Sequence, residues 1–423
     1  MTLSFPSPET IARAELPNGI TLLVYENHSS PAVVIGGYVW AGSLSEPDEE
    51  AGLAAFTAGM LMRGTENRTF GQINETLESV GAQLGFRSGV HSVAFGGKAL
   101  AEDLDLLLEI LADCLQRPTF PGKEAATLRG QILTDLQRRA HDTRRLAQLT
   151  FDELLYPDHP YGRSIQGYEE TVSGLDRDDL ERYYRAHYSP QGMALAVVGA
   201  VSSDVAIERA QAALGQWRAV DARPNRDTPD PVRLDELRRQ TVVVEGKTQS
   251  DLVLGWPGMR RTDADFMKAH LANTILGVFG MMGRLGNSVR DEQGLAYYVY
   301  SSLQAGLGAG PWQVIGGVNP ANVERAIEGI LHEIRRLRDE RVAAQELADS
   351  QSFLTGSLPL RLETNEGLLG AILDMERYAL GLDYLQRYAR LVQGVTVADV
   401  QQVARQYLDP EIYALAVAGP EAA

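Results

Sequence analysis

The chain has 423 residues, of which 44% are hydrophobic and 22% are charged, a balance typical of globular proteins with buried cores. Its formal net charge of −17 argues against nucleic acid and anionic membranes as main partners, because both require basic surfaces. The length allows two or three domains of roughly 150 residues each.

The first elements in the chain are strands. Two β-rich runs flank Pro17-Asn18-Gly19, which is a hairpin signal, and PAVVIGGYVWAGS predicts a further strand. The pattern becomes helical from Glu50, through LAAFTAGMLM and FGQINETLESVG. A strand (VHSVAFGGKAL), a strongly periodic helix (AEDLDLLLEILADCL), a helical tract over about 122–155 and the strand MALAVVGAV complete this half.

The composition then changes. Residues 220–240, VDARPNRDTPDPVRLDELRRQ, are rich in Pro, Asp and Arg without apolar periodicity, which predicts a linker. After it the order of elements recurs: strands at TVVVEG and DLVLGWPG, a helix, the strand WQVIGGV, the helix VERAIEGILHEIRRL, long helices and the strand YALAVAGP.

The two halves also resemble each other in sequence. At an offset of 220, residues 171–200 align with residues 391–420 without a gap, and ten of the thirty positions are identical. Chance would give about two matches at ordinary residue usage. We therefore predict two copies of one unit, with boundaries at 1–219 and 241–423 and the linker between them. The predicted fold is α+β, in which each half is a mostly antiparallel sheet with helices packed on one face, and the halves face each other across a central cavity.

The N-terminus MTLSFPSPETIARAEL has no basic region followed by an apolar run, so no signal peptide is expected. The longest apolar runs are too short to span a bilayer. The single cysteine, Cys114, occupies an apolar helical position and is expected to be a small core residue. These features predict a cytoplasmic protein without a disulfide or a membrane anchor.

Six segments follow one another along nearly the whole chain: LPNGITLLVYENHSSP, GSLSEPDEEAGLA, RGTENRTFGQINETLESVGAQL, YPDHPYGRSIQG, GRLGNSVRDEQGLAYYVYS and YLDPEIYALAVAGP. This series resembles the inverted-motif zinc peptidases, the family of pitrilysin, insulin-degrading enzyme and the mitochondrial processing peptidase. Six segments in this order are more specific than any single motif.

In active members the helix after Gly-Leu-Ala carries H-x-x-E-H, whose two histidines bind Zn²⁺ and whose glutamate is the general base. In this chain the corresponding positions are Ala55, Ala58 and Gly59, none of which can bind a metal or move a proton. The resemblance places the third ligand in QILTDLQRR, where Asp135 is a weak candidate that is better explained as a solvated helix residue.

No other zinc site is evident in the sequence. The seven histidines include no pair three or four residues apart, so no helix offers a ready pair of ligands. His159, in DHPYG, matches a segment that is structural in the family. We therefore expect this chain to bind no metal and no other cofactor.

The segment SVRDEQGLAYYVYS resembles the R-x6-Y segment of the family, with Arg290 and Tyr297 at the matching positions. The resemblance implies that both act on a zinc site from the opposite domain. A guanidinium and a phenol hydroxyl can stabilise the oxyanion that forms when water attacks a peptide carbonyl. The alternative is that Arg290 pairs with Asp291 or Glu292 and that Tyr297 is a half-buried strand residue.

Loss of the zinc motif together with retention of Arg290 and Tyr297 resembles the metal-free subunit of a two-chain peptidase. We therefore expect a chain that is inactive alone, positions extended peptides, and forms a heterodimer with a homologous H-x-x-E-H subunit that holds the zinc, with a homodimer possible in its absence. The segment LGVFGMMGRLGNSVR lacks the long glycine-rich loop of the mitochondrial non-catalytic subunit, which argues against presequence processing. Two alternatives remain, a non-proteolytic scaffold and a solitary hydrolase with another metal site.

Overall fold

The computed structural model describes residues 5–218, 227–278 and 283–421. The chain forms two compact units, each assembled from three segments. Unit 1 consists of Met1–Leu136, Ser164–Asp227 and Leu358–Gln386, and unit 2 consists of Gln137–Arg163, Thr228–Ser357 and Arg387–Ala423. Each unit therefore contains a segment from the other half of the internal repeat.

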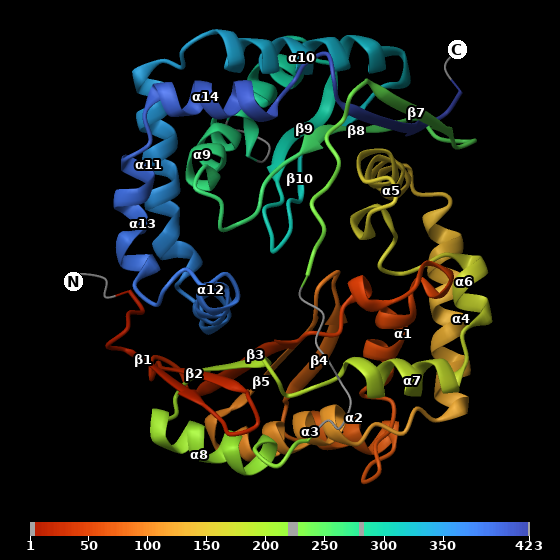
Figure 1. Ribbon diagram of the computed structural model, residues 1–423, viewed down its shortest axis with the longest axis vertical. Coiled ribbons are helices and arrows are strands. Elements are labelled where there is room, and N and C mark those ends of the chain that lie inside the picture. Colours follow the sequence, from red (N-terminus) through yellow and green to blue (C-terminus); the bar gives the residue numbers. More distant parts are fainter. Residues whose placement is uncertain (1–4, 219–226, 279–282, 422–423) are drawn as a thin grey trace. The chain divides into compact units, whose positions relative to one another are not determined.

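Unit 1 is built on a six-stranded mixed sheet with the order β1-β2-β6-β3-β5-β4 (Figure 1). Only β2 and β6 pair in parallel, and the remaining pairs are antiparallel. The predicted hairpin is confirmed between β1 and β2, where Gly19 adopts a φ of 88° at the turn. The strands are β1 (Ile11–Glu15), β2 (Thr21–Glu26), β3 (Ala32–Val39), β4 (Gln83–Ser88), β5 (Val93–Leu100) and β6 (Ala194–Gly199).

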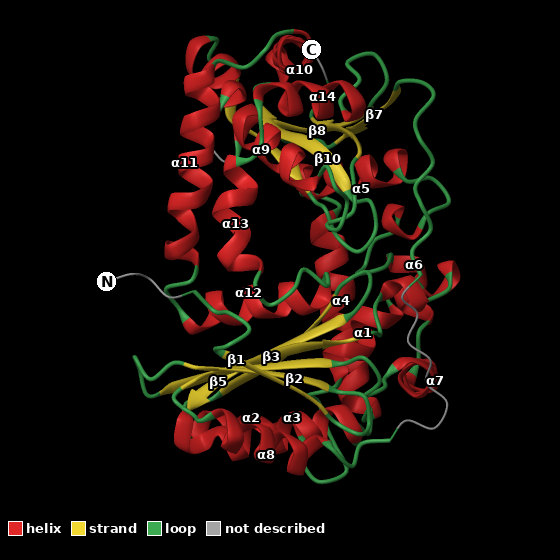
Figure 2. Cartoon of the chain, turned by 60° about the vertical axis from the view of Figure 1, so that its left-hand side comes forward, coloured by secondary structure: helices red, strands yellow, loops and turns green. Residues whose placement is uncertain are grey.

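Helices cover both faces of this sheet. Helices α3 and α8 pack on one face, and α12 lies on the other (Figure 2). On that second face, Leu369 of α12 approaches Gly36 of β3. The helices of unit 1 are α1 (Leu53–Met60), α2 (Phe70–Ser79), α3 (Leu104–Gln116), most of α4 (Gly122–Arg139), α6 (Glu169–Gly174), α7 (Arg177–His187), α8 (Ser203–Leu214) and α12 (Asn365–Arg377).

Unit 2 contains a five-stranded mixed sheet with the order β7-β11-β8-β10-β9. Its parallel pair, β7 and β11, corresponds to β2 and β6, and the whole order repeats β2-β6-β3-β5-β4 of unit 1. The recurrence confirms the internal repeat predicted from the sequence, and the α+β class is confirmed. The strands are β7 (Arg238–Val243), β8 (Ser250–Pro257), β9 (Ala296–Leu303), β10 (Pro311–Val318) and β11 (Ala414–Gly419).

Helix α5 packs on one face of this second sheet. Phe151 and Leu155 are fully buried in a cluster with Val253, Ile315 and the alanines of β11. Helix α9 contacts β9, and α10 contacts β10. The helices of unit 2 are α5 (Thr143–Leu155), α9 (Phe266–Gly277), α10 (Val323–Asp339), most of α11 (Ala344–Arg361) and of α13 (Tyr384–Gln393), and α14 (Val397–Tyr407).

The remaining helical segments are short. Residues Gly286–Glu292 form a π-helix. The 3₁₀ helices are Ser43–Ser45, Asp48–Glu50, Ala101–Asp103, Pro160–Gly162 and Pro320–Asn322. Across the described ranges, no helix combines the length and apolar character that crossing a membrane requires.

The expected linker lies partly outside the described residues, which omit 219–226. Residues 227–234 contain no helix or strand, and β7 begins at Arg238, inside the segment 220–240. The first strand of the second sheet therefore starts before the composition returns to a clear apolar pattern.

Candidate functional site

Helix α1 carries the three degenerate motif positions in unit 1. Gly52 precedes it with a φ of 99°, and the buried carboxylate of Glu46 accepts hydrogen bonds from the backbone N–H groups of Gly52 (3.0 Å) and Ala54 (2.8 Å). The negative charge of this carboxylate also interacts favourably with the helix dipole at the N-terminus of α1. The segment GSLSEPDEEAGLA thus anchors the helix even though the motif side chains are missing.

The side chains at these positions do not fit a zinc ion. Ala55 and Ala58 present only methyl groups, and a Cβ at Gly59 would lie 2.9 Å from Cδ2 of Leu128 on α4. Leu128 therefore occupies the space beside the second histidine position. Asp135 lies on α4 two turns beyond Leu128 and is partly exposed. Among the described residues, no group of three or more His, Cys, Asp or Glu side chains could hold a metal.

Purified protein is therefore expected to contain no stoichiometric zinc, because α1 supplies no imidazole or carboxylate ligand. Elemental analysis after dialysis against zinc-containing buffer measures this directly. One tightly held zinc per chain would show that ligands outside these positions form a site.

Restoring the motif by Ala55→His, Ala58→Glu and Gly59→His is expected to give weak zinc binding at most. Leu128 must move, and the supporting residues that orient zinc ligands are not prepared. Calorimetric titration with Zn²⁺ measures the affinity. A matched variant that adds Asp135→Glu tests the third ligand position, and tight binding by the triple variant alone would contradict this account.

Arg290 lies in the π-helix of unit 2. Its Nε and Nη2 donate to Asp291 Oδ1 (2.8 Å) and Oδ2 (3.2 Å). This hydrogen-bonded ion pair raises the pKa of Arg290 and lowers that of Asp291. The local pair considered as an alternative from the sequence is thus present, although the side chain of Arg290 remains 23% exposed.

Tyr297 stands at a β-bulge on β9, an edge strand of the second sheet. Tyr298 pairs with Gly317, but Val318 pairs with Ala296, so Tyr297 is the extra residue. The bulge turns the side chain outward, and Tyr297 is 63% exposed. The alternative expectation of a half-buried strand residue is therefore wrong.

The structure connects Arg290 and Tyr297 through a short, irregular segment. The carbonyl of Arg290 accepts from the N–H of Gly294 (3.1 Å), where φ is 63°, and the chain then enters β9. The six intervening residues thus contain the end of the π-helix and the left-handed Gly294, and they lead directly into the bulge at Tyr297. Ala55, Ala58, Gly59 and Asp135 belong to the other compact unit.

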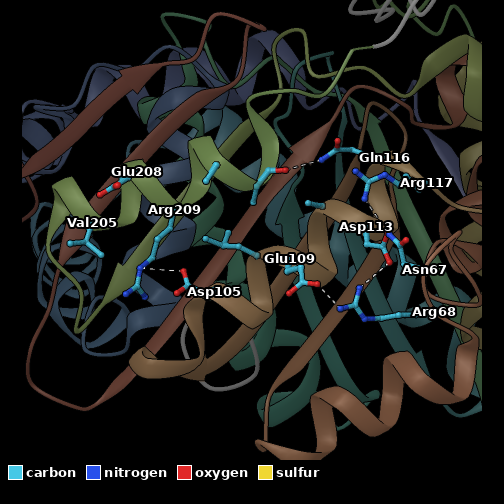
Figure 3. Close-up of a pocket in the computed structure, with 14 residues that line it drawn as sticks. Asn67, Arg68, Asp105, Glu109, Asp113, Gln116, Arg117, Val205, Glu208 and Arg209 are labelled. Atoms are coloured by element: carbon cyan, nitrogen blue, oxygen red, sulfur yellow. Dashed lines mark hydrogen bonds and ion pairs between the residues drawn. The ribbon is translucent and has the colours of Figure 1, made fainter.

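A groove of about 580 Å³ in unit 1 is lined by α3, α8 and the loop before α2 (Figure 3). Its arginines pair with acids that also line the groove: Arg68 with Glu109 (2.6 Å), Arg117 with Asp113 (3.7 Å) and Arg209 with Asp105 (3.2 Å). These pairs explain the polar lining as part of the packing between helices. None of the residues singled out from the sequence lines this groove.

Two further residues singled out from the sequence are structural. Cys114 is fully buried on α3, and burial raises the pKa of its thiol to about 12. His159 is buried, with Nδ1 accepting from the N–H of Tyr161 and Nε2 lying 3.0 Å from the carbonyl oxygen of Pro229. The core position predicted for Cys114 is confirmed.

The chain contains two repeated α+β units, each built on one sheet. Helix α1 keeps the surroundings of a zinc motif but lacks its ligands, and together these features define a peptidase-like protein. A family model described as "Insulinase (Peptidase family M16)" matches residues 22–167, and one described as "Peptidase M16 inactive domain" matches residues 174–354. The chain belongs to the M16 peptidase (insulinase) family.

The curated relatives carry names of zinc proteases and of a processing peptidase. An uncharacterized zinc protease of Streptomyces coelicolor is 26% identical over 97% of this chain and 90% of its own, and one of Bacillus subtilis is 25% identical over 97% and 98%. A probable mitochondrial-processing peptidase subunit beta of Arabidopsis thaliana is 23% identical over 98% of this chain and 79% of its own. The chain is thus a homologue of M16 zinc proteases.

Solved structures share the fold. A protein titled as the peptidase M16 inactive domain from Pseudomonas fluorescens matches with a TM-score of 0.88 at 24% identity, covering 98% of both chains. A protease from Helicobacter pylori matches with a TM-score of 0.91 at 18% identity, covering 98% of this chain and all of its own.

Proposed function

We propose that this chain is the metal-free, substrate-positioning subunit of a two-chain zinc metalloendopeptidase. The observation that carries the proposal is a contrast within one chain. Helix α1 keeps its cap but has no zinc ligand, whereas Tyr297 is turned out of its sheet at a bulge and stands 63% exposed. Exposing a tyrosine at a defined backbone irregularity fits a role in contacting another molecule.

Arg290 and Tyr297 supply donors for a developing negative charge. Arginine remains a cation at every physiological pH, and the phenol hydroxyl donates a hydrogen bond while neutral. Both would bind the oxyanion and the neighbouring carbonyls of a peptide under attack, in a site whose zinc is held by the partner subunit. Arg290 must then exchange its hydrogen bonds with Asp291 for bonds to the substrate.

The substrate class proposed is extended peptide. Strand β4 is an edge of the unit 1 sheet, it contacts α1, and none of its side chains is fully buried. An extended peptide added beside β4 would bond mainly through its backbone, which tolerates many sequences. Degradation or processing of varied peptides fits this mode better than recognition of one sequence.

The alternative function is a non-proteolytic scaffold of the same family. The pair between Arg290 and Asp291 favours it, because the guanidinium already has a hydrogen-bonded partner. Under this alternative, the exposed Tyr297 has no role in catalysis.

Reconstitution with a homologue that carries H-x-x-E-H tests the proposal. Alone, the chain is expected to leave a library of fluorogenic peptides uncleaved. Mixed with that homologue, it is expected to form a heterodimer that cleaves them, measured by size-exclusion chromatography and by fluorescence. Cleavage by the chain alone would favour a solitary hydrolase, and a heterodimer whose activity does not exceed that of the homologue alone would favour the scaffold.

A further inference from the structure

Strict alternation along β9 would place Tyr297 inside the protein. Val299 and Ser301, two and four residues further on, are 2% and 3% exposed, and Ser301 Oγ lies 2.6 Å from Oδ1 of Asn273 on α9. A regular strand turns every second side chain to the same face, so Tyr297 would also point toward α9. At the bulge, Ala296 takes the inward position with 9% exposure, and Tyr297 points outward.

A bridge across three strands lies directly beside this bulge. Gly317 of β10 pairs with Asp251 of β8 on one side and with Tyr298 of β9 on the other. Because a Cβ at Gly317 would overlap Cε1 of Tyr298, the tyrosine can lie over the glycine only while no side chain is present there. The hydroxyl of Tyr298 reaches the carboxylate of Asp251 and donates a hydrogen bond to Oδ1.

The bridge is held from several directions. Asp251 is 2% exposed, and its carboxylate also accepts from Thr143 Oγ1 (2.5 Å) and from Gln249 Nε2 (3.0 Å). The guanidinium of Arg144 lies 5.3 Å from the ring centroid of Tyr298. Burial and the bond to Asp251 raise the pKa of Tyr298, which keeps its hydroxyl protonated as a donor.

The first half of the repeat provides an internal comparison. In unit 1, the matching row across β3, β5 and β4 consists of Ile35, Gly97 and Leu84, which are apolar or lack a side chain. The register between β4 and β5 is regular from Gln83 to Ser88. Within this protein, the polar bridge and the bulge therefore occur together in one sheet and are both missing from the corresponding strands of the other.

We propose that Asp251 and Tyr298 are positioning residues for Tyr297. The hydrogen bond from the Tyr298 hydroxyl to Asp251, which crosses Gly317, fixes the register of β9 and maintains the bulge that exposes Tyr297. The effect of this bridge on catalysis rests on the proposed function, in which Tyr297 contacts the substrate. Its effect on the structure, which is the exposure of position 297, does not depend on the proposed function.

Thiol labelling of the isolated chain tests the structural consequence. The only native cysteine, Cys114, is fully buried, so Tyr297→Cys introduces one accessible thiol. We expect this variant to react with Ellman's reagent as one thiol per folded chain. Adding Tyr298→Phe or Asp251→Asn is expected to slow the reaction about tenfold or more, because reaction requires access to the thiol.

Tyr300→Phe in the same Tyr297→Cys background is the matched control. Tyr300 lies on the same strand and face, and its hydroxyl accepts from Arg144 instead of donating to Asp251. It should leave the labelling rate unchanged. The positioning role would be overturned by equal labelling rates in the Tyr298→Phe, Asp251→Asn and Tyr300→Phe variants, provided that circular dichroism shows each variant to be folded.

Kinetics of the reconstituted heterodimer separate this inference from the proposed function. With Tyr297 intact, Tyr298→Phe is expected to lower kcat with little change in KM, and to add little to the effect of Tyr297→Phe in the double variant. If labelling slows but Tyr297→Phe leaves kcat unchanged, the bridge still positions the residue and the proposed function is wrong. Slowed labelling with a shared loss of kcat supports both.

Discussion

Replacing Arg290 by alanine is expected to lower kcat of the reconstituted heterodimer by about 10²–10³-fold, the effect of removing one main oxyanion donor. Assembly and zinc content should not change, because Arg290 is partly exposed and is hydrogen-bonded to the neighbouring, exposed Asp291. The loss should fall on kcat more than on KM, since the charge that Arg290 would bind appears only in the transition state. Tyr297→Phe is expected to act in the same direction.

Glu292→Ala is the matched control for this experiment. Glu292 is exposed on the same π-helix, and the proposal gives it no contact with the substrate. Steady-state kinetics on one fluorogenic peptide should therefore show wild-type values for Glu292→Ala and a large loss for Arg290→Ala. The scaffold alternative expects equal rates for both variants, and such equality would remove the role assigned to Arg290.

The sequence predicted the class of fold and the repeat because both depend on local signals. Apolar periodicity gives the type of element, and the identities between 171–200 and 391–420 show that the elements recur in one order. Periodicity gives the apolar face of a helix but not the sheet that this face contacts. The sequence therefore does not indicate that α5 packs on the sheet of the second repeat. It likewise does not indicate that α12 packs on the sheet of the first repeat.

The sequence singles out candidate site residues but does not give their geometry. The resemblance located Arg290 and Tyr297, yet alternation along β9 predicts a buried position for Tyr297. The bulge depends on a contact between Asp251 and Tyr298, which are 47 residues apart in sequence. Likewise, the proximity of Leu128 to Gly59 depends on how α4 packs on α1, which no local pattern specifies.

Removing α5, the helix of the first repeat that packs on the sheet of the second, is expected to have the largest effect on stability. A fragment comprising residues 228–423 contains all five strands of the second sheet but lacks α5. Without α5, the cluster around Val253, Ile315 and the β11 alanines loses Phe151 and Leu155, each worth about 1.5–3 kcal/mol of burial. Since domains are stable by only about 5–15 kcal/mol, we expect this fragment to show no cooperative unfolding in urea.

Restoring α5 should recover a folded unit. Residues 137–163 can be joined to residue 228 by a short Gly/Ser linker, because Nε2 of His159 already lies 3.0 Å from the carbonyl oxygen of Pro229. We expect this fusion to unfold cooperatively, and the same fusion with Phe151→Ala to lose about 3–5 kcal/mol, the usual cost of truncating a buried phenylalanine. Urea titrations followed by circular dichroism compare the three proteins. If the fragment without α5 unfolds at the same urea concentration as the fusion, the second sheet is stable without a helix from the first repeat, and the packing of α5 contributes little to folding.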